Sequence, residues 1–271
     1  MQKLLRIFLL ILVLASTSCD SINKSVCKIG IIDTEITEYS QGFDGYDFLL
    51  NTKLQVYPYA YKTHGDYICD ITHCESINSD NIIYITAISS EKVNSSQKIL
   101  EAIKYIDSVD IRICNISLSL NENIDELDRS IIESNTLFIV AAGNYGTNLD
   151  TDPICYPACF NYDNVITVAS VNNNGELMED SNYGLNSVDI AYYGELDQIC
   201  NDCQGTSFAC ARVSAIVYKM LQANPNLTNK DIKEILISCC DQSLEGLVAS
   251  NGILNKEQAI LTATQWQYAD N

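Results

Sequence analysis

Short apolar runs alternate with helical segments through the middle of this chain, and this alternation restricts the folds that it can adopt. The runs are rich in branched residues and predict buried strands. They cover residues 28–32, 82–88, 111–118, 137–142, 165–171 and 188–191. Between several of them, apolar residues share a helical face: Ile99, Ile103 and Ile106, then Ile124, Leu127 and Ile131. The pattern predicts an α/β fold in three layers, with helices on both faces of a mostly parallel sheet.

Two helices are predicted toward the end of the chain. Residues 207–221 can form a long, mostly apolar helix that ends near Asn224-Pro225. Thr228 can cap a second helix over residues 229–237. The polar segments 42–61 and 173–186 are predicted loops, and loops at strand ends carry the site in sheets of this kind. A chain of 271 residues can bury one sizeable core, so we expect one catalytic domain.

The N-terminus has the layout of a secretory signal peptide over residues 1–18. Lys3 and Arg6 precede an apolar run over residues 7–15, and the small polar stretch Ser16-Thr17-Ser18 follows it. The run is too short to span a membrane comfortably. Cleavage before Cys19 suits either a lipoprotein anchored through that cysteine or an ordinary secreted protein. We therefore expect an extracellular or cell-envelope location, with membrane contact only through a lipid on Cys19.

Twelve cysteines are a high number for this length. In an oxidising compartment they predict at least three disulfides, with Cys200 and Cys203 among the participants because both lie in a polar loop. The short spacings of Cys155 to Cys159 and Cys200 to Cys203 leave a zinc site as an alternative. Other cysteines fit buried structural thiols or disulfides, namely Cys114, Cys239 and Cys240.

The net charge of −19 argues against a nucleic-acid partner, because phosphate binding needs clustered Lys and Arg. A cationic peptide would be favoured electrostatically, although most of this charge is expected on a solvated surface that keeps the protein soluble.

Three side chains are candidates for chemistry, and each also has a structural interpretation. Asp33 ends the first apolar run, where an Asp commonly serves a turn or a cap. His64 is one of two histidines and precedes a segment, 66–74, that can form a helix, whereas His73 fits a structural role. Ser207 falls in the first turn of the long helix after Gly205, where Thr206 or Ser207 could merely act as the cap.

Taken together, the sequence motifs around these residues resemble those of the subtilisin family of serine proteases, and the resemblance covers residues 28–262. The matching segments are Ile31-Ile32-Asp33-Thr34, His64-Gly65, Asn115-Ile116-Ser117-Leu118, Ala141-Ala142-Gly143-Asn144, Tyr156-Pro157-Ala158, Gly205-Thr206-Ser207-Phe208-Ala209, Asn224-Pro225-Asn226-Leu227-Thr228 and Asn251-Gly252-Ile253-Leu254-Asn255. Their order, Asp then His then Ser, is that of subtilisin and excludes the α/β-hydrolase and chymotrypsin orders.

The resemblance implies a serine endopeptidase in which Asp33, His64 and Ser207 form the triad and Asn144 supplies the oxyanion hole. It further implies that Ser117, Leu118 and Ser119 pair with an extended substrate. A primary specificity pocket is expected beside that segment, bordered by Ala141, Ala142, Gly143 and Cys155. The partner is thus a peptide or protein substrate, and we expect a monomer. The sequence identifies no cofactor; calcium, which subtilisins often bind, stays open because no carboxylate cluster matches such a site.

Several positions near these motifs depart from the family pattern. They are Glu35 in place of glycine, Asp66 in place of threonine, Tyr193 in place of proline, and Ala211-Arg212 in place of Pro-His. If the carboxylate of Asp66 neighbours His64, it should raise the pKa of the imidazole and move activity to higher pH. Residues 19–27 leave little room for a folding propeptide, so unaided folding or a different maturation is expected.

Two other functions stay open. A protease-like fold retained only for binding would keep the motifs without turnover. A structural cell-envelope protein is a third alternative, although no sequence feature favours it.

Overall fold

The computed structural model describes residues 27–40, 42–89, 96–196 and 203–267. Eight strands form one sheet in the order β10-β9-β8-β7-β1-β6-β3-β4, and β2 and β5 form a separate parallel pair. The strand bounds are Ile29–Asp33 (β1), Ile36–Thr37 (β2), Asp44–Asp47 (β3), Thr52–Lys53 (β4), Val56–Tyr57 (β5), Ile82–Thr86 (β6), Ile113–Ile116 (β7), Leu137–Ala141 (β8), Val165–Val171 (β9) and Ile190–Tyr193 (β10).

The sheet is parallel throughout except where β4 pairs with β3. Strand β1 lies between β6 and β7, so the chain extends the sheet in both directions from β1. Loops that follow neighbouring strands then leave in different directions and open a crevice at the carboxyl ends, where ligands bind in sheets of this type. Asp33, the last residue of β1, lies at that edge.

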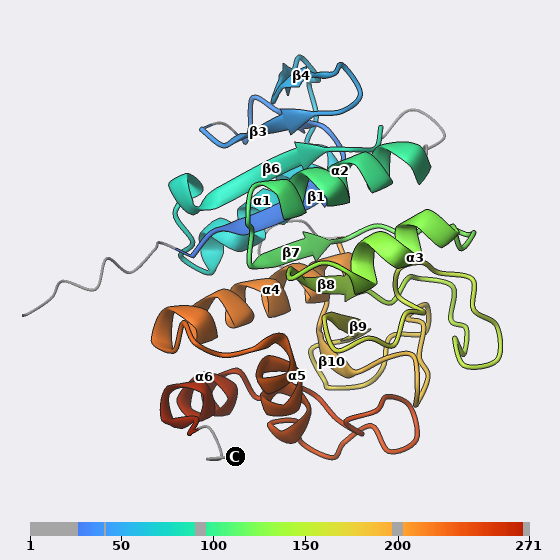
Figure 1. Cartoon of the computed structure of the whole chain (residues 1–271). Helices are drawn as coiled ribbons and strands as arrows, with labels where there is room; N and C mark the ends of the chain where they lie inside the picture. Colours follow the sequence, from blue (N-terminus) through green and yellow to red (C-terminus); the bar gives the residue numbers. More distant parts are fainter. Residues whose placement is uncertain (1–26, 41, 90–95, 197–202, 268–271) are drawn as a thin grey trace, which may run out of the picture.

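Helices cover both faces of the sheet (Figure 1). The helix bounds are His64–Cys74 (α1), Ser79–Asn81 (η1, a 3₁₀ turn), Ser96–Ser108 (α2), Asp125–Ile132 (α3), Thr206–Ala223 (α4), Asn229–Ser238 (α5) and Lys256–Gln265 (α6). Buried residues of α1, α4, α5 and α6 share one core with the sheet, and those of α2 and α3 share a second core with its other face. The predicted three-layer α/β fold is confirmed.

Helix α4 crosses the sheet and sets the position of Ser207, which lies in its first turn. Its side chains Val213, Ile216, Val217 and Met220 are fully buried, as the apolar pattern predicted. Each contributes roughly 1.5–3 kcal/mol by leaving water, as an upper estimate. This burial fixes the start of α4 rigidly against the sheet.

The segment 42–61 is not the loop that its polarity predicted, because it contains β3, β4 and β5. Gly45 explains the error. A Cβ at this position would lie 1.7 Å from the carbonyl oxygen of Tyr84 on β6, so the strand needs a glycine that breaks its apolar pattern. The segment 173–186 contains no helix or named strand, as predicted.

The prediction of at least three disulfides is wrong for this structure. Nine cysteines in the described part of the chain are free, and five of them are buried: Cys69, Cys114, Cys155, Cys210 and Cys239. Buried thiols pack as small apolar groups. Cys203 is disulfide-bonded. Cys19 and Cys200, and the predicted signal peptide, lie outside the described residues. Over the described ranges, no helix is long and apolar enough to cross a membrane.

Candidate active site

The carboxylate of Asp33 and the imidazole of His64 lie in direct contact. Asp33 Oδ1 is 2.6 Å from His64 Nδ1 and also accepts the backbone N–H of Thr34 at 2.7 Å. Asp33 is completely buried, whereas the side chain of His64 keeps 33% of its surface exposed. A buried carboxylate on Nδ1 holds the ring with Nε2 facing outward, where it can accept a proton.

Two opposing effects set the pKa of His64. Burial lowers it, because desolvation disfavours the imidazolium, but the negative charge of Asp33 and the hydrogen bond to Asp33 raise it. Together the contributions of Asp33 outweigh burial, so the pKa of His64 lies above its usual value.

Asp66 does not contribute to this shift, which corrects the expectation from the sequence. Its carboxylate accepts hydrogen bonds from the backbone N–H and the hydroxyl of Thr37, at 3.0 and 2.7 Å. It also accepts the N–H of Thr63 at 2.9 Å, while the Thr63 hydroxyl caps α1 through the N–H of Asp66. Asp66 thus completes a capping box that fixes the start of α1, and helix formation begins at His64 rather than at Asp66.

Gly65 is required by close packing beneath the histidine. A Cβ on Gly65 would lie 2.0 Å from the hydroxyl of Tyr84 and 2.9 Å from the carbonyl of Thr34. The Tyr84 hydroxyl itself donates to that carbonyl at 2.7 Å. The glycine therefore lets α1 approach β1 and β6 closely enough for His64 to reach Asp33.

Ser207 lies in the first turn of α4, one residue before a side chain that contacts the same histidine. The ring of Phe208, the next residue, stacks on the His64 ring with centroids 5.7 Å apart. The Ser207 hydroxyl donates to the carbonyl of Ser117 at 3.1 Å rather than to His64, and the Ser117 hydroxyl donates to the Ser207 carbonyl at 2.9 Å. The start of α4 is thereby tied to the end of β7, next to the Asp33–His64 pair.

The side chain of Asn144 is oriented by Thr206. Asn144 Oδ1 accepts both the backbone N–H and the hydroxyl of Thr206, at 3.0 and 2.9 Å. This leaves the Nδ2 amide protons for another acceptor. The N–H of Ser207 also lies in the first turn of α4, where N–H groups have no partner within the helix, and the N-cap residue Gly205 has no side chain to accept it. Two donors are therefore available near the Ser207 hydroxyl.

A pocket of about 230 Å³ lies beside Ser207. Most of the predicted substrate-binding residues line it, namely Ser117, Leu118, Ser119, Ala141 and Gly143, together with Asn144, Tyr145, Thr206 and Ser207. The other two, Ala142 and Cys155, are fully buried and do not line it. Cys155 lies behind Gly143, where a Cβ would meet its Sγ at 2.7 Å.

Asn182 supports this region and was not predicted from the sequence. Its Nδ2 donates to the carbonyl of Ala142 at 2.8 Å, and its Oδ1 accepts the N–H groups of Tyr145 and Thr147. These bonds hold the chain on both sides of Asn144. Asn182 lies in a polar segment without a motif, so only its contacts reveal its role. Thr206 was considered only as a cap, although it orients Asn144.

The other departures from the family pattern leave these contacts intact. Arg212 donates to the carbonyls of Tyr193 and Glu195, at 2.8 and 3.0 Å, and so ties α4 to the end of β10. Ala211 and Glu35 are fully buried. The carbonyl of Glu35 accepts the Thr63 hydroxyl at 2.6 Å, next to the cap of α1.

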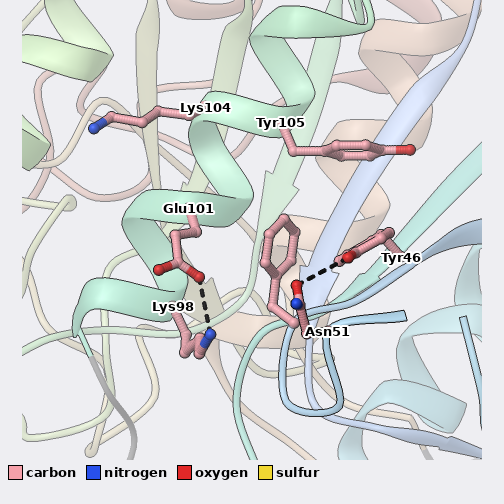
Figure 2. Close-up of a pocket in the computed structure, with 7 residues that line it drawn as sticks. Tyr46, Asn51, Lys98, Glu101, Lys104 and Tyr105 are labelled. Atoms are coloured by element: carbon pink, nitrogen blue, oxygen red, sulfur yellow. Dashed lines mark hydrogen bonds and ion pairs between the residues drawn. The ribbon is translucent and has the colours of Figure 1, made fainter. Parts of the chain in front are cut away.

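A second hollow lies between β3 and α2, and Figure 2 shows the side chains that line it. The rings of Tyr46, Phe48 and Tyr105 pack together with centroids 4.8 to 6.0 Å apart. Lys98 pairs with Glu101 at 2.9 Å, and Lys104 with Glu126 at 2.5 Å. Each lysine that lines this hollow is thus paired with a carboxylate.

The structure gives no support to the zinc alternative. Cys203 is disulfide-bonded, and a cysteine in a disulfide is not a thiolate ligand. In the described ranges, no group of three or more His, Cys, Asp or Glu is arranged to hold a metal ion.

Comparisons with known proteins relate the chain to one family. The profile of the subtilase family, Peptidase_S8, matches residues 75–256, which include Asn144 and Ser207. A thermophilic serine proteinase of Bacillus sp. (strain AK1) is 24% identical over 86% of this chain. Subtilisin-like protease 2 of Plasmodium falciparum (isolate 3D7) is 28% identical over 55% of it. The chain spans 61% of the length of the first relative and 12% of the second.

Solved structures agree on the fold. MycP1 with its N-terminal propeptide removed superposes with a TM-score of 0.70 at 20% identity, covering 92% of this chain and 93% of that one. The A-subunit of the AB5 toxin from E. coli gives 0.67 at 22% identity, covering 89% and 94%. The extent of the profile match and the shared fold show that this chain belongs to the subtilase family.

Proposed function

We propose that this chain is a serine endopeptidase in which Ser207 is the nucleophile, His64 the base and Asp33 the partner of His64. One observation carries the proposal: a buried carboxylate lies 2.6 Å from Nδ1 of a histidine whose ring stacks on the residue after Ser207. Family membership supports it, since subtilases are typically serine peptidases. The proposed peptidase domain covers residues 28–262.

In the first step, His64 Nε2 takes the proton of the Ser207 hydroxyl as Ser207 Oγ bonds to the carbonyl carbon of the substrate. The hydroxyl must first rotate away from Ser117, to which it donates in the free protein. Asp33 stabilises the imidazolium that forms and keeps its own negative charge.

Negative charge then develops on the former carbonyl oxygen. Among the described residues, the Nδ2 amide of Asn144 and the backbone N–H of Ser207 have no acceptor and are available to stabilise this charge. The orientation of Asn144 is set in advance by Thr206, so little reorganisation is needed as the charge appears. The positive end of α4 adds to this stabilisation.

When the tetrahedral intermediate collapses, His64 gives its proton to the leaving amine and the carbon–nitrogen bond breaks. The acyl group stays on Ser207 as an ester. His64 then takes a proton from the water that attacks this ester. It gives the proton to Ser207 Oγ as the acyl–oxygen bond breaks, and the second product leaves with a free carboxylate. The pocket lined by Ala141 and Gly143 would hold the side chain before the cut.

A binding protein without turnover is the second candidate, and one observation favours it. The Ser207 hydroxyl donates to Ser117 rather than to His64, so the last hydrogen bond of a triad is not formed in the free protein. Catalytic hydrogen bonds are often poorly aligned without substrate, which is why the protease remains the better proposal.

A fluorophosphonate probe separates the two candidates, because it reacts with a serine only when a base activates it and donors accept the developing charge. Wild type should label at Ser207, Ser207→Ala should not label, and His64→Ala should label far more slowly while keeping its thermal transition. If folded wild type does not label between about pH 6 and pH 10, the binding protein replaces the protease.

We also propose export, supported by the layout of residues 1–18. Expression in a bacterial host should yield a mature chain that begins at Cys19. Incorporation of labelled palmitate would identify the lipid-anchored form, whereas an unlabelled chain in the medium would identify the secreted form. A cytosolic chain that keeps residues 1–18 would contradict export.

A further inference from the structure

A wide hollow of about 710 Å³ adjoins the pocket beside Ser207 and shares Asn144 and Tyr145 with it. The loop that follows β9 supplies much of its wall, with Asn172, Leu177, Met178, Glu179 and Asp180, and Gly146, Glu195 and Gln204 complete it. A peptide that lies across Asn144 therefore contacts both the small pocket and this larger hollow.

The carboxylates of this hollow have no cationic partner among the residues that the structure describes. There, the side chains of Glu179 and Asp180 make no hydrogen bond or ion pair, and the carboxylate of Glu195 accepts only the backbone N–H of Asn173, at 2.7 Å. Arg212 does not neutralise them, since its guanidinium donates to two backbone carbonyls. Three negative charges thus border a hollow whose lining includes no Lys or Arg.

The surrounding sequence strengthens this asymmetry. Residues 130–211 contain eleven Asp and Glu and no Lys, Arg or His. This stretch supplies Asn144, Ser207 and the whole lining of the hollow. More than half of the net charge of −19 therefore belongs to one part of the chain, and a cation approaching Asn144 meets an attractive potential.

The hollow also has an apolar wall. Met178 is nearly buried and Leu177 is half-buried, and both lie beside the two carboxylates in the chain. Lys and Arg pack their methylene stems on such surfaces while their charged heads reach carboxylates. This combination fits a long cationic side chain better than a small ion, and no metal-binding group occurs among the residues described here.

We propose that this hollow binds a Lys or Arg side chain of the peptide substrate on the leaving-group side of the cleaved bond, with Glu179 and Asp180 as specificity-determining residues. The inference rests on the proposed protease function. Residues before the cut are expected along Ser117 to Ser119, and the hollow lies beyond Asn144 from that segment, sharing only Asn144 and Tyr145 with the pocket there. Glu195 adds charge at the rim.

The size of the preference follows from the exposure of the carboxylates. Glu179 is exposed and Asp180 is half-buried, so each contact with a cation is partly screened by water. Two such contacts should favour a Lys or Arg substrate by roughly five- to tenfold in kcat/KM over the same peptide with Gln. Glu at that position should be disfavoured.

The test uses the full mature chain and internally quenched peptides that are identical except for Arg, Gln or Glu directly after the cut, with the cleaved bond identified by mass spectrometry. Wild type should cleave the Arg peptide about five- to tenfold faster than the Gln peptide, and the ratio should fall in 1 M NaCl. Glu179→Gln with Asp180→Asn should bring the ratio close to one. Glu245→Gln, the same change at an exposed residue between α5 and α6, should keep the wild-type ratio.

The outcomes distinguish the two levels of the proposal. Equal cleavage of the Arg and Gln peptides by wild type, with normal fluorophosphonate labelling, overturns this inference and leaves the protease intact. A preference that survives the double substitution in a protein with a wild-type thermal transition also overturns it, because other groups would then carry the specificity. Failure to cleave any peptide or to label overturns the protease and this inference with it.

Discussion

Two hollows of nearly equal volume, about 710 and about 690 Å³, lie beside Asn144 and beside Tyr105. Beside Tyr105, each lysine of the lining has a carboxylate partner. Figure 2 shows the Lys98–Glu101 pair, with the rings of Tyr46 and Tyr105 on the other side of the hollow. Beside Asn144, no cation within the described ranges pairs with Glu179 or Asp180, and the Nδ2 amide of Asn144 has no acceptor among those residues.

The volume of a hollow therefore does not distinguish a binding site from a gap in the packing. Charged side chains that already pair with one another contribute little to ligand affinity, since a ligand must first replace those interactions. Polar side chains that are held in place but have no partner can form new interactions with a ligand directly. Substitutions near Asn144 should therefore have large effects on catalysis, and substitutions near Tyr105 should have small ones.

The largest effect should come from Asp33→Asn, which leaves the shape of the site intact but removes the charge beside His64. An amide donates to Nδ1 and favours the wrong tautomer, so kcat should fall by about 10⁴. Steady-state hydrolysis of a peptide substrate measures it, with a thermal unfolding curve to verify folding. A fall of less than tenfold would mean that Asp33 is not the partner of the catalytic base.

Removing the amide donor of Asn144 should have the next largest effect. Asn144→Ala should lower turnover by roughly 10² to 10³, a figure that comes from subtilisin itself, with a smaller change in KM because the amide acts mainly in the transition state. Asn174→Ala, on the exposed loop after β9, is the matched control and should leave turnover unchanged. Equal effects of the two substitutions would contradict the oxyanion role.

Asp66→Asn separates a buried structural carboxylate from a catalytic one. Asp66 and Asp33 are both fully buried, but Asp66 binds Thr37 and Thr63. Loss of these charge-assisted bonds should lower the free energy of unfolding by about 1.5–3 kcal/mol, measured by urea titration.

The pH profile should distinguish the same two aspartates. His64 must be neutral to act as a base, so kcat/KM should rise with pH through a midpoint above the usual pKa of histidine. Asp66→Asn should keep that midpoint, whereas Asp33→Asn should move it to lower pH. Because the pKa of folded His64 is raised, its contribution to stability is full below the usual pKa and is lost as pH rises through the raised pKa. A lower midpoint in Asp66→Asn would restore the sequence-based expectation.

The smallest effect should come from Lys98→Gln in the hollow beside Tyr105. The Lys98–Glu101 pair is about one-third exposed, with 34% and 35% of the two side chains accessible. Its loss should change the free energy of unfolding by less than about 1 kcal/mol and leave kcat/KM unchanged. A fall in kcat/KM of more than about threefold, roughly 0.65 kcal/mol, would show that this hollow belongs to the substrate site. It would contradict the functional difference between the two hollows.

The arrangement of strands and helices could be predicted where local periodicity is strong. The runs that became β1, β6, β7, β8 and β9 are continuous and apolar because both faces of a central parallel strand are buried. Strand β3 could not be found in this way. Its Gly45 is set by the close approach of β6, a contact between chain segments that no local pattern encodes.

Adjacency in the sequence was misleading at Asp66. The residue lies two positions after His64, yet helix geometry directs the first-turn carboxylate back to Thr63 and to Thr37. The number of cysteines was misleading as well, because whether two thiols can bond depends on their separation in the fold. The predicted participation of Cys203 in a disulfide is confirmed.

The sequence by itself determined the α/β fold and the order of the motifs around Asp33, His64 and Ser207. Hydrophobic periodicity and short sequence motifs are local properties of the chain. Only the tertiary structure decided how Asn144 is oriented, by bonds to Thr206 62 residues away. It alone also decided that Lys98 has a carboxylate partner, whereas Glu179 and Asp180 have no cationic partner in the part of the chain that the structure describes. The physical reason is that hydrogen bonds and ion pairs act over a few ångströms in space. The chain sets those distances only when the sheet and its helices have packed.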